Sequence, residues 1–287
     1  MLLHTRPPYN FCGSENLPFE KCEVAVLPVP YDSTTSYKAG TREGPHAIIV
    51  ASRNMESLDL ELKKDISAVG ICTLDELEPS TDSPEKTMNR VEEAVGSIIE
   101  AGKFPVMLGG EHSLTLGAVR ALSKKHKKLS VLQIDAHADL REEYEGSKYN
   151  HACVMRRVRE ICPTVQVGIR SMCEEELEYV ERKGVKGIYG LEYDYEKLLK
   201  GLTDEVYITV DLDGLDPSIM PAVGTPEPGG LLWKEVLELL RKVCENKKVV
   251  GFDVMELCPL PGNVAPDFIA SKLTYKLIGY SLLLKGE

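Results

Sequence analysis

The sequence predicts an α/β fold built on a parallel sheet, and three observations support this. Short runs rich in β-branched residues recur along the chain and have the length of strands. Several runs are continuously apolar rather than alternating, which is typical of strands buried on both faces. Stretches with the apolar spacing of helices lie between most of these runs. This alternation indicates a doubly wound sheet covered by helices.

Eight strands and six helices are expected. The strands are Glu23–Pro30, Ile66–Ile71, Phe104–Leu108, Leu129–Asp135, Thr164–Ile169, Val185–Tyr189, Glu205–Asp211 and Lys248–Val254. The helices are Pro84–Ala101, Ser113–Lys125, His151–Cys162, Glu174–Lys183, Leu232–Glu245 and Asp267–Leu284. Ser83 before Pro84 and Glu85 is typical of a helix start, because serine caps backbone amides and proline fits the first turn. No long linker divides the chain, so we predict a single domain over residues 1–287.

The charge balance favours a cationic partner. The chain has 34 Lys and Arg against 45 Asp and Glu, which gives a formal net charge of −11. Nucleic acids and anionic membranes bind basic surfaces, so neither is expected as a partner. Metal cations and small basic molecules remain.

The cysteines and the apolar pattern indicate a cytoplasmic protein. Eight cysteines are scattered along the chain and no pair has C-x-x-C spacing, so we expect reduced thiols that pack in the core. The first residues, Met1–Pro8, lack the pattern of a signal peptide. No apolar stretch approaches the ~18 residues that span a membrane.

Charged or imidazole side chains directly follow four of the predicted strands. The four segments are Gly109-Gly110-Glu111-His112, Asp135-Ala136-His137-Ala138-Asp139, Asp211-Leu212-Asp213 and Asp253-Val254-Met255-Glu256. Ligands of open α/β sheets bind at the carboxyl ends of the strands. Residues two apart in an extended segment share a face, so Asp135, His137 and Asp139 are expected to converge, as are Asp211 and Asp213.

These side chains predict a binuclear metal centre. Four converging carboxylates would repel one another, and some would have to bind protons, unless cations neutralised them. An oxygen-rich set with His112 and His137 as nitrogen ligands suits Mn²⁺ better than Zn²⁺. A single aspartate at a strand end is more often a helix cap than a ligand. Four such strand ends in one sheet are not explained by caps.

The same residues resemble the ureohydrolase family, which includes the arginases and agmatinases. The resemblance covers nearly the whole chain. Three signature blocks carry it, Gly109–Ser113, Asp135–Asp139 and Val210–Pro217, with supporting blocks at Gly40–Pro45, Gly224–Leu231 and Asp253–Glu256. It implies a three-layer fold in which helices cover both faces of an eight-stranded, mostly parallel sheet. Because family members are commonly trimers or hexamers, a homo-oligomer is expected.

The resemblance also implies a role for each site residue. Two Mn²⁺ ions per subunit are expected, the first held by His112, Asp135, Asp139 and Asp211, and the second by His137, Asp135, Asp211 and Asp213. Glu256 matches the carboxylate that grips the guanidinium group of the substrate. Asp139 would pass a proton to the leaving amine. His151 would exchange protons between the site and bulk water.

Hydrolysis of agmatine to putrescine and urea is the predicted reaction. The loop Gly224–Gly230 contains Glu-Pro, as in agmatinases, where arginases usually have apolar residues. Arg141 and Tyr149 occupy positions at which arginases carry carboxylate-binding asparagines. Arginine and guanidinobutyrate remain alternatives, because Arg141 can pair with a carboxylate and Ala152-Cys153 replaces the Gly-Thr of many agmatinases.

Three other classes are less consistent with the sequence. A zinc deacetylase of related fold would use one metal and fewer carboxylates. A non-catalytic metal-binding relative would be expected to lose ligands, whereas all six ligand positions are filled. A binuclear phosphoesterase would need G-D-x-x-D and G-N-H-[DE] blocks, and the sequence has neither.

Overall fold

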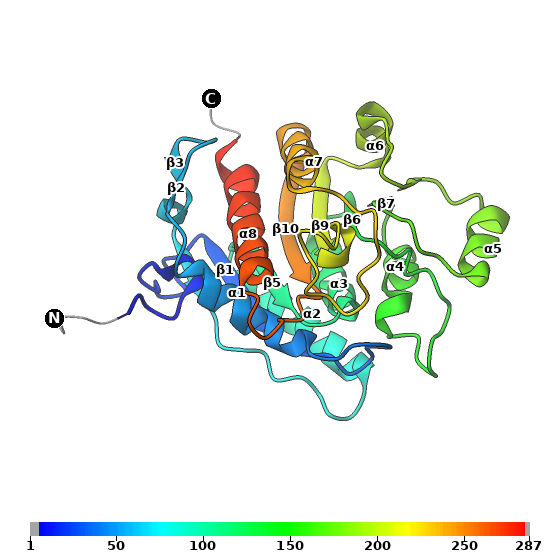
Figure 1. The fold of residues 1–287 in the computed structure, drawn as a ribbon, viewed down its shortest axis with the longest axis horizontal. Coiled ribbons are helices and arrows are strands. Elements are labelled where there is room, and N and C mark those ends of the chain that lie inside the picture. The colour runs from blue at the N-terminus through cyan, green and yellow to red at the C-terminus, as the bar shows by residue number, and fades with distance from the viewer. Residues whose placement is uncertain (1–5, 285–287) are drawn as a thin grey trace.

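The predicted parallel α/β sheet is confirmed. The computed structural model describes residues 6–284 and contains an eight-stranded sheet in the order β4-β1-β5-β10-β9-β6-β7-β8 (Figure 1). Every pairing between neighbouring strands of this sheet is parallel. The strands are β1 (Val24–Val29), β4 (Ile71–Thr73), β5 (Phe104–Gly109), β6 (Leu129–Ile134), β7 (Thr164–Val167), β8 (Ile188–Tyr189), β9 (Glu205–Asp211) and β10 (Lys248–Met255).

Helices cover both faces of the sheet, because alternate strand residues enter two separate cores. Val24 and Val26 of β1 belong to one core and Ala25 and Leu27 to the other. The first core packs under α1 (Gly44–Ser52), α6 (Tyr195–Gly201), α7 (Trp233–Asn246) and α8 (Ala265–Leu283). The second packs under α2 (Pro84–Glu100), α3 (Thr115–Lys125), α4 (Val154–Val158) and part of α5 (Glu174–Lys183).

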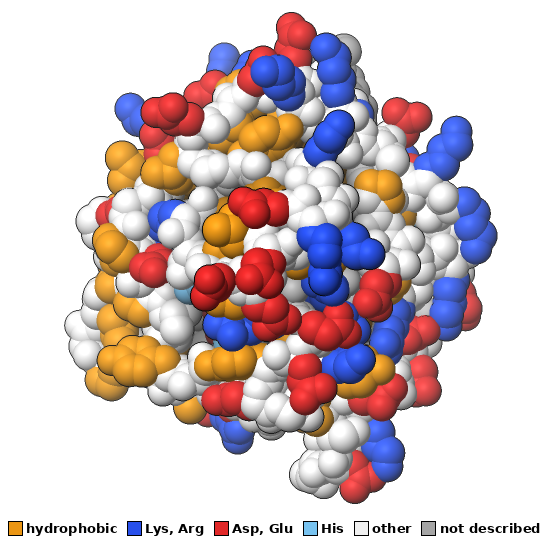
Figure 2. Space-filling model, turned by 90° about the vertical axis from the view of Figure 1, so that its right-hand side faces the viewer, with side chains coloured by type: hydrophobic (Ala, Val, Ile, Leu, Met, Phe, Trp, Pro, Cys, Tyr) orange, Lys and Arg blue, Asp and Glu red, His pale blue; other side chains and the backbone are white. Residues whose placement is uncertain are grey.

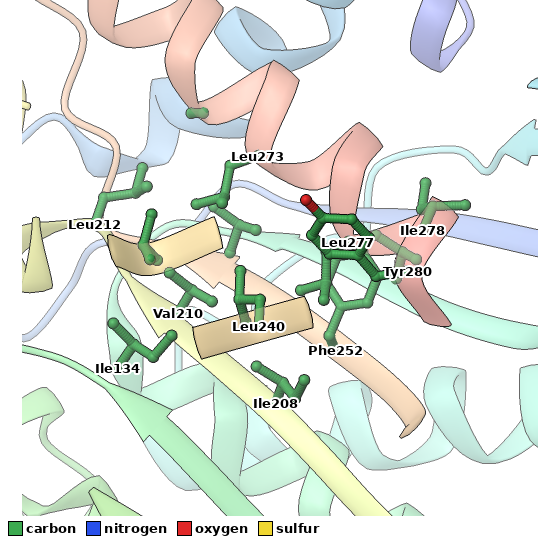
Figure 3. Close-up of a cluster of buried hydrophobic side chains, with 14 of the residues drawn as sticks. Ile134, Ile208, Val210, Leu212, Leu240, Phe252, Leu273, Leu277, Ile278 and Tyr280 are labelled. Atoms are coloured by element: carbon green, nitrogen blue, oxygen red, sulfur yellow. The ribbon is translucent and has the colours of Figure 1, made fainter. Parts of the chain in front are cut away.

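The core beneath α7 and α8 shows why the central strands are apolar throughout. Val210 of β9 and Phe252 of β10 share one cluster with Leu240 of α7 and Leu277 of α8 (Figure 3). All four side chains are fully buried. Burial on both faces removes the alternation of apolar and polar residues that marks a half-exposed strand. The apolar runs were therefore reliable signals for these strands.

One predicted strand is displaced. Residues Ile66–Val69 form a 3-10 turn, and β4 begins only at Ile71. The Asp65 carboxylate accepts a hydrogen bond from the Ser67 amide (2.9 Å) and starts this turn. Ile66 is fully buried against Gly279 of α8, at which a β-carbon would lie 2.5 Å from the Ile66 Cδ1 atom. The apolar residue that suggested a strand packs under a helix.

Other boundaries also differ from the prediction. The helix expected over His151–Cys162 is a 3-10 turn, His151–Cys153, followed by the short α4. Helix α1 was not predicted because it is almost entirely apolar and therefore lacks amphipathic spacing. It lies between β5 and α8, as its contacts with both show. Helix α6 and a hairpin of β2 (Leu58–Asp59) and β3 (Lys64–Asp65) were also missed.

The expectation that every thiol is reduced is wrong for one pair. Cys22 and Cys72 form a disulfide, with a Cα–Cα distance of 5.7 Å. Cys72 lies on β4, and Cys22 lies two residues before the neighbouring strand β1. Fifty residues separate the two in sequence, so spacing alone could not reveal that they meet. Cys153, Cys162 and Cys258 are buried, as expected of core thiols.

Two further predictions concern the extent of the chain. A single domain over residues 1–287 stays a prediction, supported by one sheet whose strands run from Val24 to Met255. Within residues 6–284, no helix is long and apolar enough to cross a membrane. Residues 1–5 lie outside the described residues, and so does most of the prediction made for Met1–Pro8.

The sheet order brings the four polar segments together. Strands β5, β10, β9 and β6 are consecutive neighbours at the centre of the sheet, and each carries one segment at its carboxyl end. The register places Met255 beside Asp211 and Ile134 beside Val210. These strands therefore end at nearly the same level, which creates the candidate site.

Candidate metal centre and its pocket

A cavity of about 250 Å³ opens at the carboxyl ends of the central strands. Six of the eight predicted site residues line it: His137, Asp139, His151, Asp211, Asp213 and Glu256. The other two, His112 and Asp135, are buried, and they contact the carboxylates or imidazole of this lining. The structure thus brings all eight predicted residues into one place.

The first group of candidate ligands surrounds the His112 imidazole. Its Nδ1 atom lies 3.0 Å from the Asp135 Oδ2 atom and 3.2 Å from both the Asp139 Oδ2 and Asp211 Oδ2 atoms. Within the described chain, this nitrogen has no hydrogen-bond partner of suitable geometry. A buried nitrogen facing three carboxylate oxygens matches the donor set of a divalent cation.

The second group lies on the other side of Asp135. The His137 Nδ1 atom is 2.9 Å from the Asp213 Oδ2 atom and 3.7 Å from the Asp135 Oδ1 atom. Asp135 therefore has one oxygen toward each group, as expected of a bridging ligand. Asp211 contacts the first group and, through Oδ1, accepts the Asp213 amide (3.0 Å). That Asp211 bridges two metal ions stays a prediction.

Close backbone approach explains the glycines that precede His112. A β-carbon at Gly110 would lie 1.8 Å from the Tyr31 carbonyl oxygen, and one at Gly109 would lie 1.9 Å from the Met255 Sδ atom. A larger residue at Gly110 would displace the backbone of the segment after β1, and one at Gly109 would displace the Met255 side chain. The glycines therefore allow the chain to pass close to Tyr31 and Met255 immediately before His112.

Two candidate site residues have positive backbone φ angles. Asp139 has a φ of 53° and Glu256 a φ of 67°. This region is unfavourable for residues other than glycine, so the surrounding contacts must hold these side chains in place. The Glu256 amide donates to the Gly110 carbonyl (2.8 Å), and the Arg156 amide donates to the Asp139 carbonyl (3.0 Å).

Burial of these charges shifts their pKa values strongly. Burial and then the Asp135 charge raise the pKa of Asp139 to about 7. Burial and then the charge of Asp213 raise the pKa of Asp211 well above its usual value. At His137, burial opposes the imidazolium, but Asp135 and Asp213 outweigh it and raise the pKa to about 12. Protons thus gather where divalent cations would neutralise the same carboxylates.

Two strand residues that were not predicted hold the ligands in position. The Thr209 Oγ1 atom lies 2.8 Å from the His112 Nε2 atom, and the Gln133 amide donates to Asp135 (2.5 Å). Partners of this kind fix the ring orientation and the tautomer of a metal-binding histidine. Each stands two residues before an aspartate ligand and so shares a face of the extended chain with it. That spacing is a signal that could have identified them.

Replacing Thr209 by valine should weaken metal binding. The variant keeps the shape of the side chain but leaves His112 Nε2 without its partner, and losses of this kind typically cost about 10–100-fold in metal affinity. We expect this weakening in Mn²⁺ titrations of the metal-free protein, and near-normal affinity for Thr209→Ser, which keeps the hydroxyl. Equal affinities for valine and serine would contradict the assignment.

Metal uptake should release protons and strengthen as the pH rises. A histidine must be deprotonated to bind a metal ion. Because the pKa of His137 is raised to about 12, its ring is protonated near neutral pH until a metal displaces the proton. Affinity should therefore rise by about tenfold per pH unit for each proton released. Calorimetry in buffers with different ionisation heats measures that proton; buffer-independent heats would contradict the prediction.

Glu256 and His151 both line the cavity, and different neighbours hold them in place. The Glu256 Oε1 atom accepts the His112 amide (2.6 Å), and burial, followed by the Asp211 charge, raises the pKa of Glu256. His151 is half-buried, and its Nε2 atom lies 3.4 Å from the Ser36 hydroxyl. Burial lowers the pKa of His151 to about 4. A carboxyl group with a raised pKa and a neutral imidazole thus flank the candidate metal centre.

The outer wall carries the residues considered for substrate choice. Arg141 lines the cavity, and its guanidinium stacks 4.4 Å from the centre of the Tyr144 ring. Tyr149 instead donates its hydroxyl to Glu85 (2.8 Å). Glu143 and Glu145 are exposed.

Figure 2 shows the side of the molecule that carries α5 and α6, where acidic side chains gather near the centre of the face.

Arg170 is a further residue that the sequence did not reveal. Its guanidinium donates to the carbonyl oxygens of Asp213 and Glu227, each at 2.7 Å. It therefore ties the end of β9 to the Gly224–Gly230 loop, which closes one side of the cavity with Gly224 and Thr225.

Comparison with known proteins identifies the family. The model of the arginase family matches residues 22–279. The chain belongs to the arginase family. As an arginase-family protein it is a hydrolase, and its sheet and surrounding helices are the fold of this family.

Three arginase-family relatives are similar over almost their full length. The N(1)-aminopropylagmatine ureohydrolase of Synechocystis sp. is 40% identical, with 96% of this chain and 95% of the relative covered. The agmatinase of Pyrococcus horikoshii is 35% identical, with 98% and 99% covered. The crystal structure of the agmatine ureohydrolase of Thermoplasma volcanium superimposes with a TM-score of 0.84 at 36% identity, covering 92% of each chain.

Proposed function

We propose that this arginase-family protein hydrolyses the guanidino group of agmatine or of agmatine extended by an aminopropyl group, releasing urea and an amine. One observation carries the proposal: the cage of four aspartates and two histidines opens into the same cavity as Glu256. The aspartates and histidines suit divalent cations. The Glu256 side chain suits a cationic guanidinium group.

We propose His112, Asp135, Asp139 and Asp211 as ligands of one Mn²⁺ ion and His137, Asp135, Asp211 and Asp213 as ligands of a second. The orphaned Nδ1 atom of His112 among three carboxylates supports this assignment. The two groups of candidate ligands, one around His112 and one around His137, also fit a binuclear centre better than the single zinc ion of a deacetylase. Bound divalent ions supply Lewis acidity, which activates water for attack on a carbon atom.

The protein's own groups bind the substrate and move its protons. Glu256 holds the guanidinium by charge-assisted hydrogen bonds and orients its central carbon. Asp139 takes a proton from the attacking water and delivers it to the leaving amine nitrogen, so that the C–N bond breaks and urea forms. His151 passes protons between the cavity and bulk water, a role that suits a neutral imidazole.

Relatives support two closely related substrates. Agmatine would give putrescine and urea, and the relative from Pyrococcus horikoshii is named an agmatinase. Relatives named N(1)-aminopropylagmatine ureohydrolase are up to 40% identical, which favours the extended amine as the second candidate. Tyr37, which lines the cavity, is 83% exposed, so this part of the lining reaches solvent, where a longer substrate chain can extend. Arginine and guanidinobutyrate require a carboxylate partner, for which Arg141 is the candidate.

A substrate panel tests the proposal. Urea release should be measured with Mn²⁺ for agmatine, N(1)-aminopropylagmatine, arginine and guanidinobutyrate, together with metal content per subunit. We expect two metal ions per subunit and the highest kcat/KM for one of the two amines. Preferred turnover of a carboxylate-bearing substrate, or one bound zinc ion, would contradict it. Light scattering should show the trimer or hexamer that we propose for this cytoplasmic enzyme.

A further inference from the structure

A buried carboxylate beside the candidate metal centre makes its hydrogen bonds to Thr34 and Ser113. Glu111 immediately precedes His112 and is fully buried. Its Oε2 atom accepts the Thr34 amide (2.6 Å), and its Oε1 atom accepts the hydroxyls of Thr34 (2.6 Å) and Ser113 (2.5 Å). Short bonds to a carboxylate are the strong, charge-assisted kind. Glu111 therefore anchors the segment around Thr34, which follows β1.

The anchored threonine lies directly against His151. The Thr34 Oγ1 atom is 3.0 Å from the His151 amide nitrogen and 3.3 Å from the His151 Nδ1 atom. The Asn150 side chain also donates to the Thr34 carbonyl (3.4 Å). A continuous chain of hydrogen bonds thus runs from Glu111 through Thr34 to His151. It joins the end of β5 to the turn that begins α4.

The proton count along this chain determines the state of the imidazole. A threonine hydroxyl has one hydrogen and two acceptor lone pairs. At Thr34 the hydrogen goes to the Glu111 carboxylate, so toward His151 this hydroxyl can only accept. It accepts from the backbone amide and therefore also from a protonated Nδ1. The proton of the neutral ring then lies on Nδ1, and Nε2 is left with its lone pair beside the Ser36 hydroxyl.

We propose that Glu111 and Thr34 are positioning residues that hold His151 in its Nδ1–H tautomer, with Nε2 as the atom that accepts and releases protons at the cavity. This inference rests on the proposed function for the role of His151 in turnover. The tautomer itself is inferred from the hydrogen bonds around Thr34, with Glu111 as the acceptor, and does not depend on that role. A histidine held in the wrong tautomer presents an N–H where a proton acceptor is needed, which slows each proton transfer.

Thr34→Val is the main variant, because it keeps the shape of the side chain and removes only the hydroxyl; Thr34→Ser keeps the hydroxyl and is its matched control. We expect Thr34→Val to lower kcat by about tenfold or more with unchanged metal content, and Thr34→Ser to stay near wild type. In a His151→Ala background, Thr34→Val should cause no further loss. An equal loss in both backgrounds would overturn the proposal, since it would show a structural role independent of His151.

Nitrogen-15 NMR of the full-length protein, loaded with diamagnetic Mg²⁺ or Cd²⁺, reads the tautomer without turnover. We expect Nδ1–H in the wild type and in Thr34→Ser, and a shift toward Nε2–H in Thr34→Val and in Glu111→Gln. An Nε2–H ring in the wild type, or no change in Thr34→Val, would overturn the proposal. A wild type that releases no urea from any substrate would instead overturn the proposed function, and the tautomer would still be decided.

Discussion

Replacing Asp139 by asparagine should lower kcat by about 10²–10⁴, the usual contribution of a general acid and base. The Asp139 Oδ2 atom lies 3.2 Å from the His112 Nδ1 atom, and asparagine can keep an oxygen at that position. Its amide cannot carry a transferable proton at neutral pH. Asp139 is buried, with a pKa raised to about 7 by burial and by Asp135. A loss of turnover with metal retained would isolate proton transfer from metal binding.

The experiment needs metal analysis and a matched carboxylate variant. Metal content should be measured on the same Asp139→Asn protein used for urea release, at a Mn²⁺ concentration high enough to fill the weakened site. Glu143→Gln removes an exposed carboxylate four residues further along, and we expect wild-type turnover from it. An Asp139→Asn protein that holds its metal and turns over at the wild-type rate would refute the assigned role.

Replacing Glu256 by glutamine should lower kcat/KM for the guanidino substrate by about 10²–10³. Hydrogen bonds between charged groups contribute about 1.5–3 kcal/mol each, and the variant loses the charge on its side of them. Glutamine still offers an oxygen to the His112 amide, which Glu256 accepts at 2.6 Å in the structure. The fold at this strand end should therefore survive, and the loss should appear in substrate binding and turnover.

Competition by the guanidinium ion separates binding from structure. Guanidinium carries only the group that Glu256 is proposed to bind. It should therefore inhibit the wild type and inhibit Glu256→Gln much more weakly. Glu227→Gln is the matched control, since the Glu227 side chain does not line the cavity. We expect wild-type inhibition from this control. Equal inhibition of wild type and Glu256→Gln would show that the carboxylate does not hold the guanidinium.

The sequence was most informative where burial and chemistry act along a short segment. The apolar runs that became β5, β6, β9 and β10 are buried on both faces, so their composition alone marked them as strands. The segments after these strands stood out because their charged residues directly follow an apolar run. Prediction failed where an apolar residue packs for another purpose: Ile66 lies under α8 rather than in the sheet.

Some residues were missed because their partners are distant in sequence. Thr209 matters only because β9 carries it toward His112, 97 residues away in sequence. The Cys22–Cys72 disulfide joins residues that become neighbours only when β4 pairs with β1. The spacing of Thr209 before Asp211 could mark it as a site residue, but no local pattern names the distant partner in either contact.

By itself the sequence determined the α/β class, the eight candidate site residues and the acidic character that calls for cations. Only the tertiary structure decided that β5, β10, β9 and β6 lie side by side, and so that four strand ends form one cavity. Only it placed Glu111 and Thr34 behind His151. The physical reason is that local composition records burial, whereas strand order is set by packing between distant segments.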